Sequence, residues 1–212
     1  MRVEIVDRVC YHPAAANAPI LQDVSMQLAP NQLGAIVGSS GAGKTTLLEI
    51  LSGLAKPTSG QIAWNDRPLK SHHLRRLAGL VFQFPERHFC SFSVYDELRV
   101  GHPELREADI TRSLEQVGLE KIPLGRSPLQ LSGGQQRRLS LAVQLVRSPF
   151  LLLLDEPTAG LDWSVRQQVI DLLAKLKQHW SILVVTHDPE TFDAIADTKW
   201  RLDAGKLSLD SQ

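Results

Sequence analysis

A glycine-rich segment, GSSGAGKTT from Gly38 to Thr46, carries the residue types that hold phosphate groups. Glycines let consecutive backbone N–H groups face one anion, and the spacing G-x-x-x-x-G-K-[ST] is that of the Walker A pattern. Lys44 would reach the β- and γ-phosphates of a nucleotide, and Thr45 would offer its hydroxyl to Mg²⁺. We expect the whole segment to bind nucleotide, namely Gly38, Ser39, Ser40, Gly41, Ala42, Gly43, Lys44, Thr45 and Thr46.

Two carboxylates, Asp155 and Glu156, follow the apolar run Phe150 to Leu154. We expect that run to form a strand buried on both faces of a parallel sheet, whose carboxyl end opens on the crevice where such sheets bind ligands. An ionised Asp155 can hold Mg²⁺, and Glu156 can accept a proton from an attacking water. A solvated strand end would be the preferred interpretation if the glycine-rich segment were absent. With both segments present, the sequence predicts a site that hydrolyses a nucleotide.

A third segment, LSGGQQRR from Leu131 to Arg138, has no obvious role in a site that the other two already make. Its glycines and the N-terminus of the helix expected after it form a second place for an anion, and Ser132 adds a hydroxyl donor. An ordinary glycine-containing turn before a helix would fit the local composition. It would leave the ordered set of three segments unexplained.

Strands and helices must position these segments. The apolar run Gln32 to Val37 is typical of a buried strand, and Lys44 to Leu54 has apolar residues at helical spacing. From roughly Phe84 to Val146 the pattern is helical, and strand and helix then alternate again. That alternation predicts the strand Phe150 to Leu154, the helix Ser164 to His179 and the strand Ile182 to Thr186. A helical insertion in an α/β core is the simplest fold.

The composition is that of one domain with balanced charge. The chain has 212 residues, of which 43% are hydrophobic, and its formal net charge is zero. It has no run near eighteen apolar residues and no charged-then-apolar leader, so we expect it neither to span a membrane nor to be secreted. Balanced charge argues against a nucleic-acid-binding surface over most of the protein and leaves a local patch open; we expect no nucleic acid as a partner. Cys10 and Cys90 lie in no metal-binding pattern, and we expect reduced thiols in a cytoplasmic protein.

In this order, GSSGAGKTT, LSGGQQRR and LLLLDEP resemble the ATP-binding-cassette (ABC) ATPase domain, and the resemblance spans nearly the whole chain. LSGGQ is the stretch that separates this family from other phosphate-loop NTPases. The resemblance implies that Tyr11 stacks on adenine, Gln83 senses the γ-phosphate, Asp162 ends a dimer-contacting loop (AGLD), and His187 acts as a switch. It implies ATP and Mg²⁺ as cofactors, with catalysis by Glu156, His187 and Gln83 and metal binding by Thr45, Gln83 and Asp155.

The family resemblance also explains the third segment. It implies that Ser132, Gly133, Gly134 and Gln135 cap the γ-phosphate bound by a facing subunit. ATP would then hold a head-to-tail dimer together, formed by two copies of this chain or by this chain and a second ABC ATPase. The expected fold class is α/β, a phosphate-loop NTPase core of ABC type with a β subdomain and an inserted helical subdomain. Residues 1–212 would form one ABC ATPase domain, with residues 1–83 and 147–212 in the core and about 84–146 in the helical subdomain.

Four of the six phenylalanines, Phe82, Phe84, Phe89 and Phe92, fall at the start of the predicted helical insertion. One interpretation is core packing of the small lobe, since aromatic residues are commonly buried. The other is a partly exposed groove beside Gln83 that receives a short helix of a membrane subunit. The sequence leaves both interpretations open.

The segment FQFPERHFCSFSVYDELRVG resembles energy-coupling-factor ATPases, and FQFPER resembles cyanobacterial and plastid members. Those proteins often continue into a C-terminal dimerisation region, whereas this sequence ends soon after Leu209, so we expect ATP to supply more of the dimer affinity. We predict a MgATP-hydrolysing subunit of a membrane transporter, an importer of a metal ion or vitamin, on the cytoplasmic face of the cell membrane. A soluble ABC ATPase of iron–sulfur cluster assembly is the alternative. A DNA-repair or translation ATPase is disfavoured, because those carry a long coiled-coil insertion or two cassettes.

Overall fold

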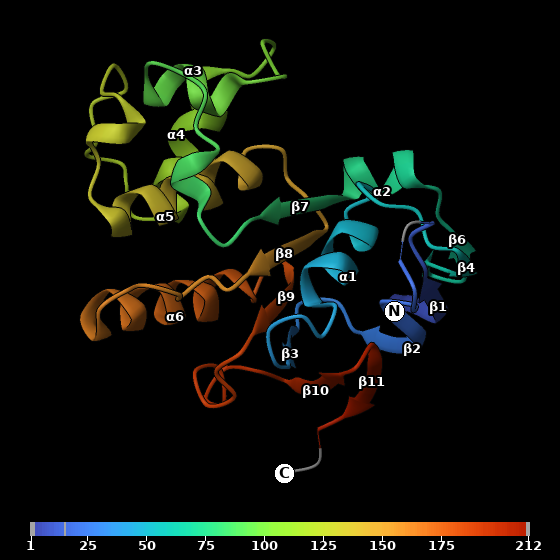
Figure 1. Cartoon of the computed structure of the whole chain (residues 1–212). Helices are drawn as coiled ribbons and strands as arrows, with labels where there is room; N and C mark the ends of the chain where they lie inside the picture. The colour runs from blue at the N-terminus through green and yellow to red at the C-terminus, as the bar shows by residue number, and fades with distance from the viewer. Residues whose placement is uncertain (1–2, 15, 211–212) are drawn as a thin grey trace.

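A six-stranded sheet forms the centre of the molecule (Figure 1). The structure is a computed structural model that describes residues 3–14 and 16–210. The strand order is β11-β10-β3-β9-β8-β7, and every neighbouring pair is parallel except β10 with β11. The strands are β3 (Leu33–Val37), β7 (Ala78–Val81), β8 (Leu151–Asp155), β9 (Ser181–Thr186), β10 (Thr198–Asp203) and β11 (Lys206–Leu209).

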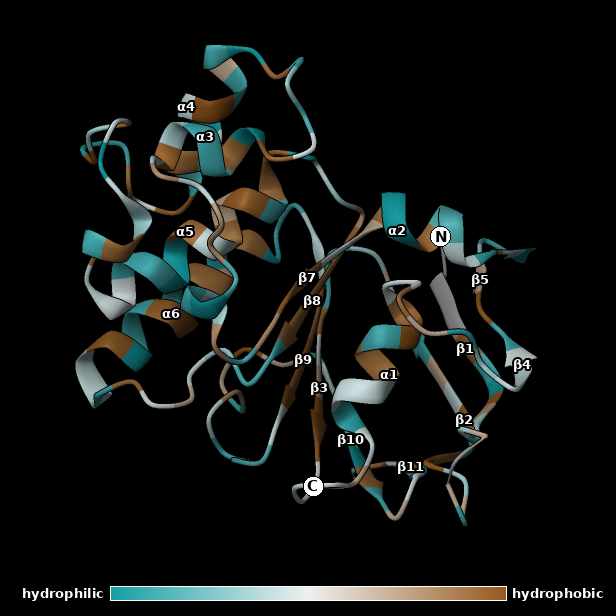
Figure 2. Ribbon diagram, turned by 45° about the horizontal axis from the view of Figure 1, so that its top comes forward, coloured by the Kyte–Doolittle hydropathy of each residue, from teal (hydrophilic) through white to brown (hydrophobic). Residues whose placement is uncertain are grey.

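Helices cover both faces of this sheet, and alternating side chains of each strand pack on opposite sides. Leu151 and Leu153 of β8 belong to the hydrophobic cluster that contains α1 (Lys44–Leu51). Leu152 and Leu154 belong to the cluster that contains α5 (Gly133–Leu145) and α6 (Trp163–Leu176). Figure 2 shows α1 on one side of the apolar strands and α5 and α6 on the other. The continuous apolar runs of the sequence are therefore buried on both faces, as predicted for parallel strands.

A second sheet covers the outer side of α1. It is antiparallel, with the order β2-β1-β4, and a short hairpin of β5 and β6 follows it. In β2 the buried residues Leu21, Val24, Met26 and Leu28 pack in the same cluster as α1. The elements are β1 (Val3–Tyr11), β2 (Leu21–Leu28), β4 (Ser59–Gln61), β5 (Ala63–Trp64), β6 (Arg67–Pro68) and α2 (Ser71–Leu77).

Residues 84–146 contain helices and loops but no strand, and this range is described throughout. Its elements are the 3-10 helix η1 (Pro85–Arg87), α3 (Val94–Arg99), α4 (Glu107–Gln116), the 3-10 helix η2 (Pro128–Gln130) and α5. α5 contacts η1, η2, α3, α4 and β7, and so joins the helical part to the central sheet. Nowhere in the described residues does a helix combine the length and apolar character needed to span a bilayer.

Several predicted element boundaries differ from the structure. β3 begins at Leu33 rather than Gln32, α6 at Trp163 rather than Ser164 and β9 at Ser181 rather than Ile182, and β8 ends at Asp155 rather than Leu154. The helix from Lys44 ends at Leu51 rather than Leu54, because Gly53 adopts a φ of +76° and Leu54 is exposed. The strand predicted from Phe150 begins at Leu151, where pairing with Ala78 of β7 begins, and the Phe150 side chain is 57% exposed. The helix predicted to reach His179 is α6, which ends at Leu176.

Candidate active site

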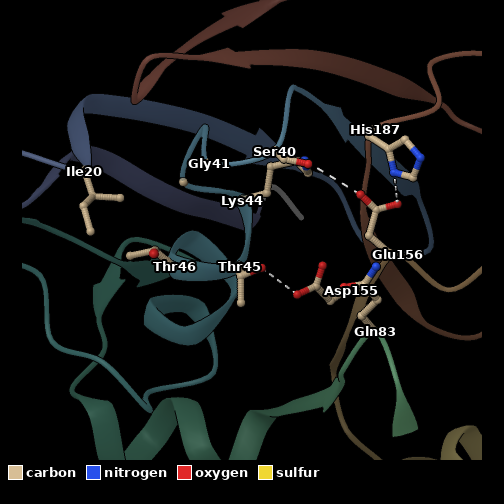
Figure 3. A pocket seen from close by; sticks show the side chains of 11 residues that line it. Ile20, Ser40, Gly41, Lys44, Thr45, Thr46, Gln83, Asp155, Glu156 and His187 are labelled. Atoms are coloured by element: carbon tan, nitrogen blue, oxygen red, sulfur yellow. Dashed lines mark hydrogen bonds and ion pairs between the residues drawn. The ribbon is translucent and has the colours of Figure 1, made fainter. Parts of the chain in front are cut away.

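A cavity of about 540 Å³ opens at the carboxyl ends of β3, β9, β8 and β7 (Figure 3). Its volume lies in the range typical of small-molecule sites. Because these neighbouring strands are parallel, the segments that follow them meet at one edge of the sheet. The cavity is lined by Ile20, Ser40, Gly41, Gly43, Lys44, Thr45, Thr46, Gln83, Asp155, Glu156 and His187.

The predicted phosphate loop connects β3 to α1. Gly43 is the N-cap of α1 with a φ of +104°, which glycine adopts at little cost. A Cβ at Gly38 would lie 2.3 Å from the carbonyl oxygen of Leu202, so this position must lack a side chain. The loop therefore holds the positive end of the α1 dipole towards the cavity, an arrangement suited to phosphate.

Lys44 is buried among loop carbonyls rather than extended into solvent. Its Nζ donates to the carbonyl oxygens of Gly38 at 2.7 Å and Ser39 at 3.1 Å. The same atom lies 3.7 Å from Oε1 of Glu156. Gly38, Ser39 and the buried Ala42 thus do not line the cavity; Gly38 and Ser39 position the lysine that does.

Asp155 and Thr45 form the second contact across the cavity. The Thr45 hydroxyl donates to Oδ2 of Asp155 at 2.7 Å. Burial raises the pKa of the Asp155 carboxyl, the Thr45 hydrogen bond opposes that change, and the neighbouring Glu156 charge adds to it. Gln83, which follows β7, lines the same cavity. Hydroxyl, carboxylate and amide oxygens at a phosphate loop fit Mg²⁺, which takes few protein ligands beside substrate phosphates.

Glu156 and His187 form the third contact. Glu156 is buried and has a φ of +47°, a left-handed conformation that is uncommon for a non-glycine residue. Its Oε2 lies 2.9 Å from Nδ1 of His187, whose side chain is 62% exposed. Because an ionised carboxylate can only accept, Nδ1 carries the hydrogen and Nε2 is left for other partners.

Beyond Gly38, Ser39 and Ala42, three further groups of predicted site residues do not line this cavity. Tyr11 does not line it, whereas Ile20, whose amide donates to the Tyr11 carbonyl at 2.8 Å, does. Ser132 is the N-cap of α5, where its hydroxyl accepts from the Gln135 amide at 3.3 Å. Asp162 is the N-cap of α6 and accepts from the amide of Val165 at 3.0 Å. Tyr11 ends β1, whereas Ser132, Gly133, Gly134, Gln135 and Asp162 lie at helix N-termini outside the chain's own cavity.

Sequence reasoning overlooked Arg137, Thr186 and Ile20. Arg137 of α5 is buried and donates to the carbonyl oxygens of Gln83 and, at 3.0 Å, of Ala159. Burial lowers the pKa of its guanidinium, and Glu86 opposes that change. The sequence did offer one signal for the burial of Arg137: it lies one helical turn before Leu141, which is also buried. Thr186 donates to Oε2 of Glu156 at 3.2 Å, and the sequence signal for it was its place directly before His187 in the segment THD.

The model of the family described as ABC transporter matches residues 21–159. The chain belongs to the ABC transporter family. This confirms the family predicted from the sequence, and the ABC protein is therefore an ATPase with the expected α/β fold.

Named relatives of this ABC ATPase include a plant and a bacterial protein. ABC transporter I family member 11, chloroplastic, of Arabidopsis thaliana is 44% identical over 219 residues, which cover 96% of this chain and 78% of the relative. Energy-coupling factor transporter ATP-binding protein EcfA2 of Bacillus subtilis (strain 168) is 37% identical over 192 residues, covering 84% of this chain and 70% of that protein.

A solved structure shows the same architecture. The structure of cbiO1 from Clostridium perfringens, part of the ABC transporter complex cbiONQ, superimposes with a TM-score of 0.89 at 28% sequence identity. The match covers 98% of this chain and 88% of that chain. The energy-coupling-factor resemblance of the segment FQFPERHFCSFSVYDELRVG is matched by the name of the Bacillus subtilis relative, and the plastid resemblance of FQFPER by the name of the Arabidopsis relative.

Asp155→Asn should stabilise the fold of the ABC ATPase. Because burial raises the pKa of Asp155 above its ordinary 3.8, the folded state binds the proton more tightly, and stability falls as pH rises through that range. Asparagine keeps an acceptor for Thr45 without the charge. We expect Tm at pH 7.5 to rise by about 2–4 °C, which corresponds to about 1 kcal/mol in a domain of this size.

Thermal unfolding without nucleotide, repeated between pH 4 and 8, measures this effect. The difference in Tm between Asp155→Asn and the unsubstituted protein should shrink as the pH is lowered, because Asp155 itself becomes neutral. A Tm below that of the unsubstituted protein at pH 7.5 would contradict the prediction.

Proposed function

We propose that this chain is the MgATP-hydrolysing subunit of an energy-coupling-factor transporter that imports a metal ion or a vitamin. The observation that supports the catalytic part is the meeting of Lys44, Thr45, Asp155, Glu156 and His187 in one cavity. They come from three separate strand ends, and each is a residue type that can bind phosphate or Mg²⁺ or accept a proton.

In this proposal the loop amides and Lys44 hold the β- and γ-phosphates of ATP. Bound Mg²⁺ would neutralise phosphate charge, and Thr45, Asp155 and Gln83 are the residues that would hold it. Glu156 accepts a proton from the attacking water, and the products are ADP and inorganic phosphate. His187 then orients the water or the γ-phosphate through Nε2, because Nδ1 is engaged with Glu156.

Glu156→Gln should retain ATP binding and slow turnover by a factor on the order of 10² or more, since a general base contributes that much. Steady-state phosphate release and equilibrium ATP binding by the purified chain measure the two effects. Glu115→Gln, the same change at an exposed position of α4, serves as control and should leave turnover unchanged. Turnover near that of the unsubstituted protein in the Glu156 variant would refute the assignment.

The dimer is a second part of the proposal. Ser132, Gly133, Gly134 and Gln135 form the exposed or half-exposed start of α5, away from the chain's own cavity. Amides and dipole at this N-terminus suit the γ-phosphate held by a facing subunit. Asp162, at the start of α6, would contact that subunit. Each complete site would then combine Lys44 of one subunit with Ser132 of the other.

Mixing two inactive variants tests this arrangement. Lys44→Ala and Ser132→Arg should each abolish hydrolysis, because each breaks both sites of a homodimer. In the mixed dimer one site is doubly broken and the other is intact, so random mixing should restore roughly a quarter of full activity if the sites act independently. Subunit exchange is checked with labelled chains. No recovery after confirmed exchange would contradict independent sites shared between subunits.

Membrane transport is supported by the relatives. The Bacillus subtilis relative is named a transporter ATP-binding protein, the Arabidopsis relative is named an ABC transporter family member, and cbiO1 is part of an ABC transporter complex. These names favour transport over the alternative of iron–sulfur cluster assembly. In this proposal the ATPase binds a membrane-embedded subunit at the cytoplasmic face of the cell membrane, where ATP is supplied. No nucleic acid is required in this function.

The aromatic segment after β7 is the docking site that we propose for the membrane subunit. Phe92 is 94% exposed and Phe84 is 37% exposed, whereas Phe89 packs partly buried against the core. Beside them lies a cavity of about 150 Å³ lined in part by Phe82, Phe89 and Val143. Exposed aromatic residues beside an apolar cavity suit a short amphipathic helix.

Phe92→Ser and Phe84→Ser should therefore reduce co-purification with the membrane subunit at least tenfold while basal hydrolysis stays unchanged. Phe150→Ser is the matched control, because Phe150 is an exposed phenylalanine at the opposite end of β8. Pull-down from detergent-solubilised membranes measures the effect. If Phe150→Ser reduces co-purification with the membrane subunit equally, a general change of the surface is responsible and the proposed docking site is refuted.

A further inference from the structure

The two carboxylate oxygens of Glu156 have different surroundings (Figure 3). Oε2 is engaged by two groups, Nδ1 of His187 at 2.9 Å and Oγ1 of Thr186 at 3.2 Å. Oε1 faces Nζ of Lys44 at 3.7 Å, which is beyond hydrogen-bond distance. Two donors on one oxygen leave the other as the one that can take a new hydrogen.

The direction of the Thr186 hydrogen bond follows from its second partner. The amide of Asp188 donates to Oγ1 of Thr186 at 3.1 Å. A hydroxyl has one hydrogen, and an ionised carboxylate has none to give, so the Thr186 hydrogen goes to Oε2 of Glu156. Thr186 is only 2% exposed, which limits competition from water for this bond.

The backbone of Thr186 reaches the phosphate loop. Its carbonyl oxygen accepts from the amide of Gly38 at 3.2 Å. Thr186 is therefore hydrogen-bonded both to the start of the phosphate loop and to the carboxylate that follows β8. Glu156 also has the left-handed backbone described above, a conformation that persists only where surrounding contacts hold it. The Thr186 hydroxyl is one of those contacts.

We propose that Thr186 is a positioning residue whose hydroxyl holds Oε2 of Glu156, so that Oε1 is the atom that accepts the proton from water. The inference rests on the proposed function, in which Glu156 is the general base. As the water oxygen forms its bond to the γ-phosphorus, its proton passes to Oε1. The bond from the γ-phosphorus to the bridging oxygen breaks, and that electron pair leaves with ADP.

Variants that separate the hydroxyl from the shape of Thr186 test the proposal. Thr186→Val keeps the shape and removes the hydroxyl, so kcat should fall about tenfold, while KM for MgATP stays within about twofold. The factor is that expected when a single hydrogen bond of about 1.4 kcal/mol is lost in the transition state. Thr186→Ser restores the hydroxyl and should keep kcat within about threefold. If Thr186 acts by packing alone, the valine variant is the active one, and the proposal is overturned.

A control variant and a second pair of Thr186 variants distinguish loss of the hydrogen bond from a general folding defect. Ser181 begins the same strand and has a buried hydroxyl that accepts from the Asn31 amide at 3.2 Å. Ser181→Ala should leave kcat unchanged. Should the valine variant fail to fold, Thr186→Ser and Thr186→Ala differ only in the hydroxyl oxygen. The serine variant should then be about tenfold faster, and equal rates overturn the proposal.

A double-mutant cycle shows whether Thr186 acts through Glu156. In the Glu156→Gln background, Thr186→Val should cause no further loss of turnover, because the base that it positions is already gone. A further tenfold loss means that Thr186 acts by another route, such as the phosphate loop, and overturns the proposal. If Glu156→Gln alone turns over normally, the proposed function fails. If that variant is slow and Thr186→Val is fast, only the positioning role fails.

Discussion

Parallel pairing of β3, β9, β8 and β7 is the constraint on which the rest of the structure depends. The register places Val37 beside Thr186 and Asp155 beside Val185. Segments that are far apart in the sequence therefore meet at one edge of the sheet. Because helices cover both faces, a strand cannot shift along its neighbour without exposing apolar residues to water. The geometry of the site is thus a consequence of the core.

The polar groups of the cavity satisfy one another. Lys44 donates to loop carbonyls, Thr45 donates to Asp155, and Glu156 accepts from Thr186 and His187. These are the same atoms that the proposed function assigns to phosphate, metal and water. Substrate binding then exchanges one set of hydrogen bonds for another, and only the difference contributes to affinity. A buried cation and two buried carboxylates are tolerated because none lacks a partner.

The features that were predicted correctly from the sequence are those that depend on short local patterns. Glycine spacing between an apolar run and a helical repeat was enough to locate the loop between β3 and α1. The contact of Thr186 with Glu156 could not be predicted, because it depends on the pairing of two strands that are distant in the sequence. Phe150 was wrongly placed in a strand because its hydrophobicity does not show where the neighbouring strand begins. The role of Tyr11 stays a prediction.

Arg137 gives the helical part a fixed connection to two loops. Its guanidinium joins α5 to the carbonyl oxygens of Gln83 and Ala159, and it is buried, so water cannot readily replace either bond. Any tilt of α5 relative to the sheet would pull on both loops at the same time. One loop borders the candidate metal site, and the other leads to the start of α6. A force applied to the helices would therefore reach the loop that borders the candidate metal site and the loop before α6 at the same time, through one side chain.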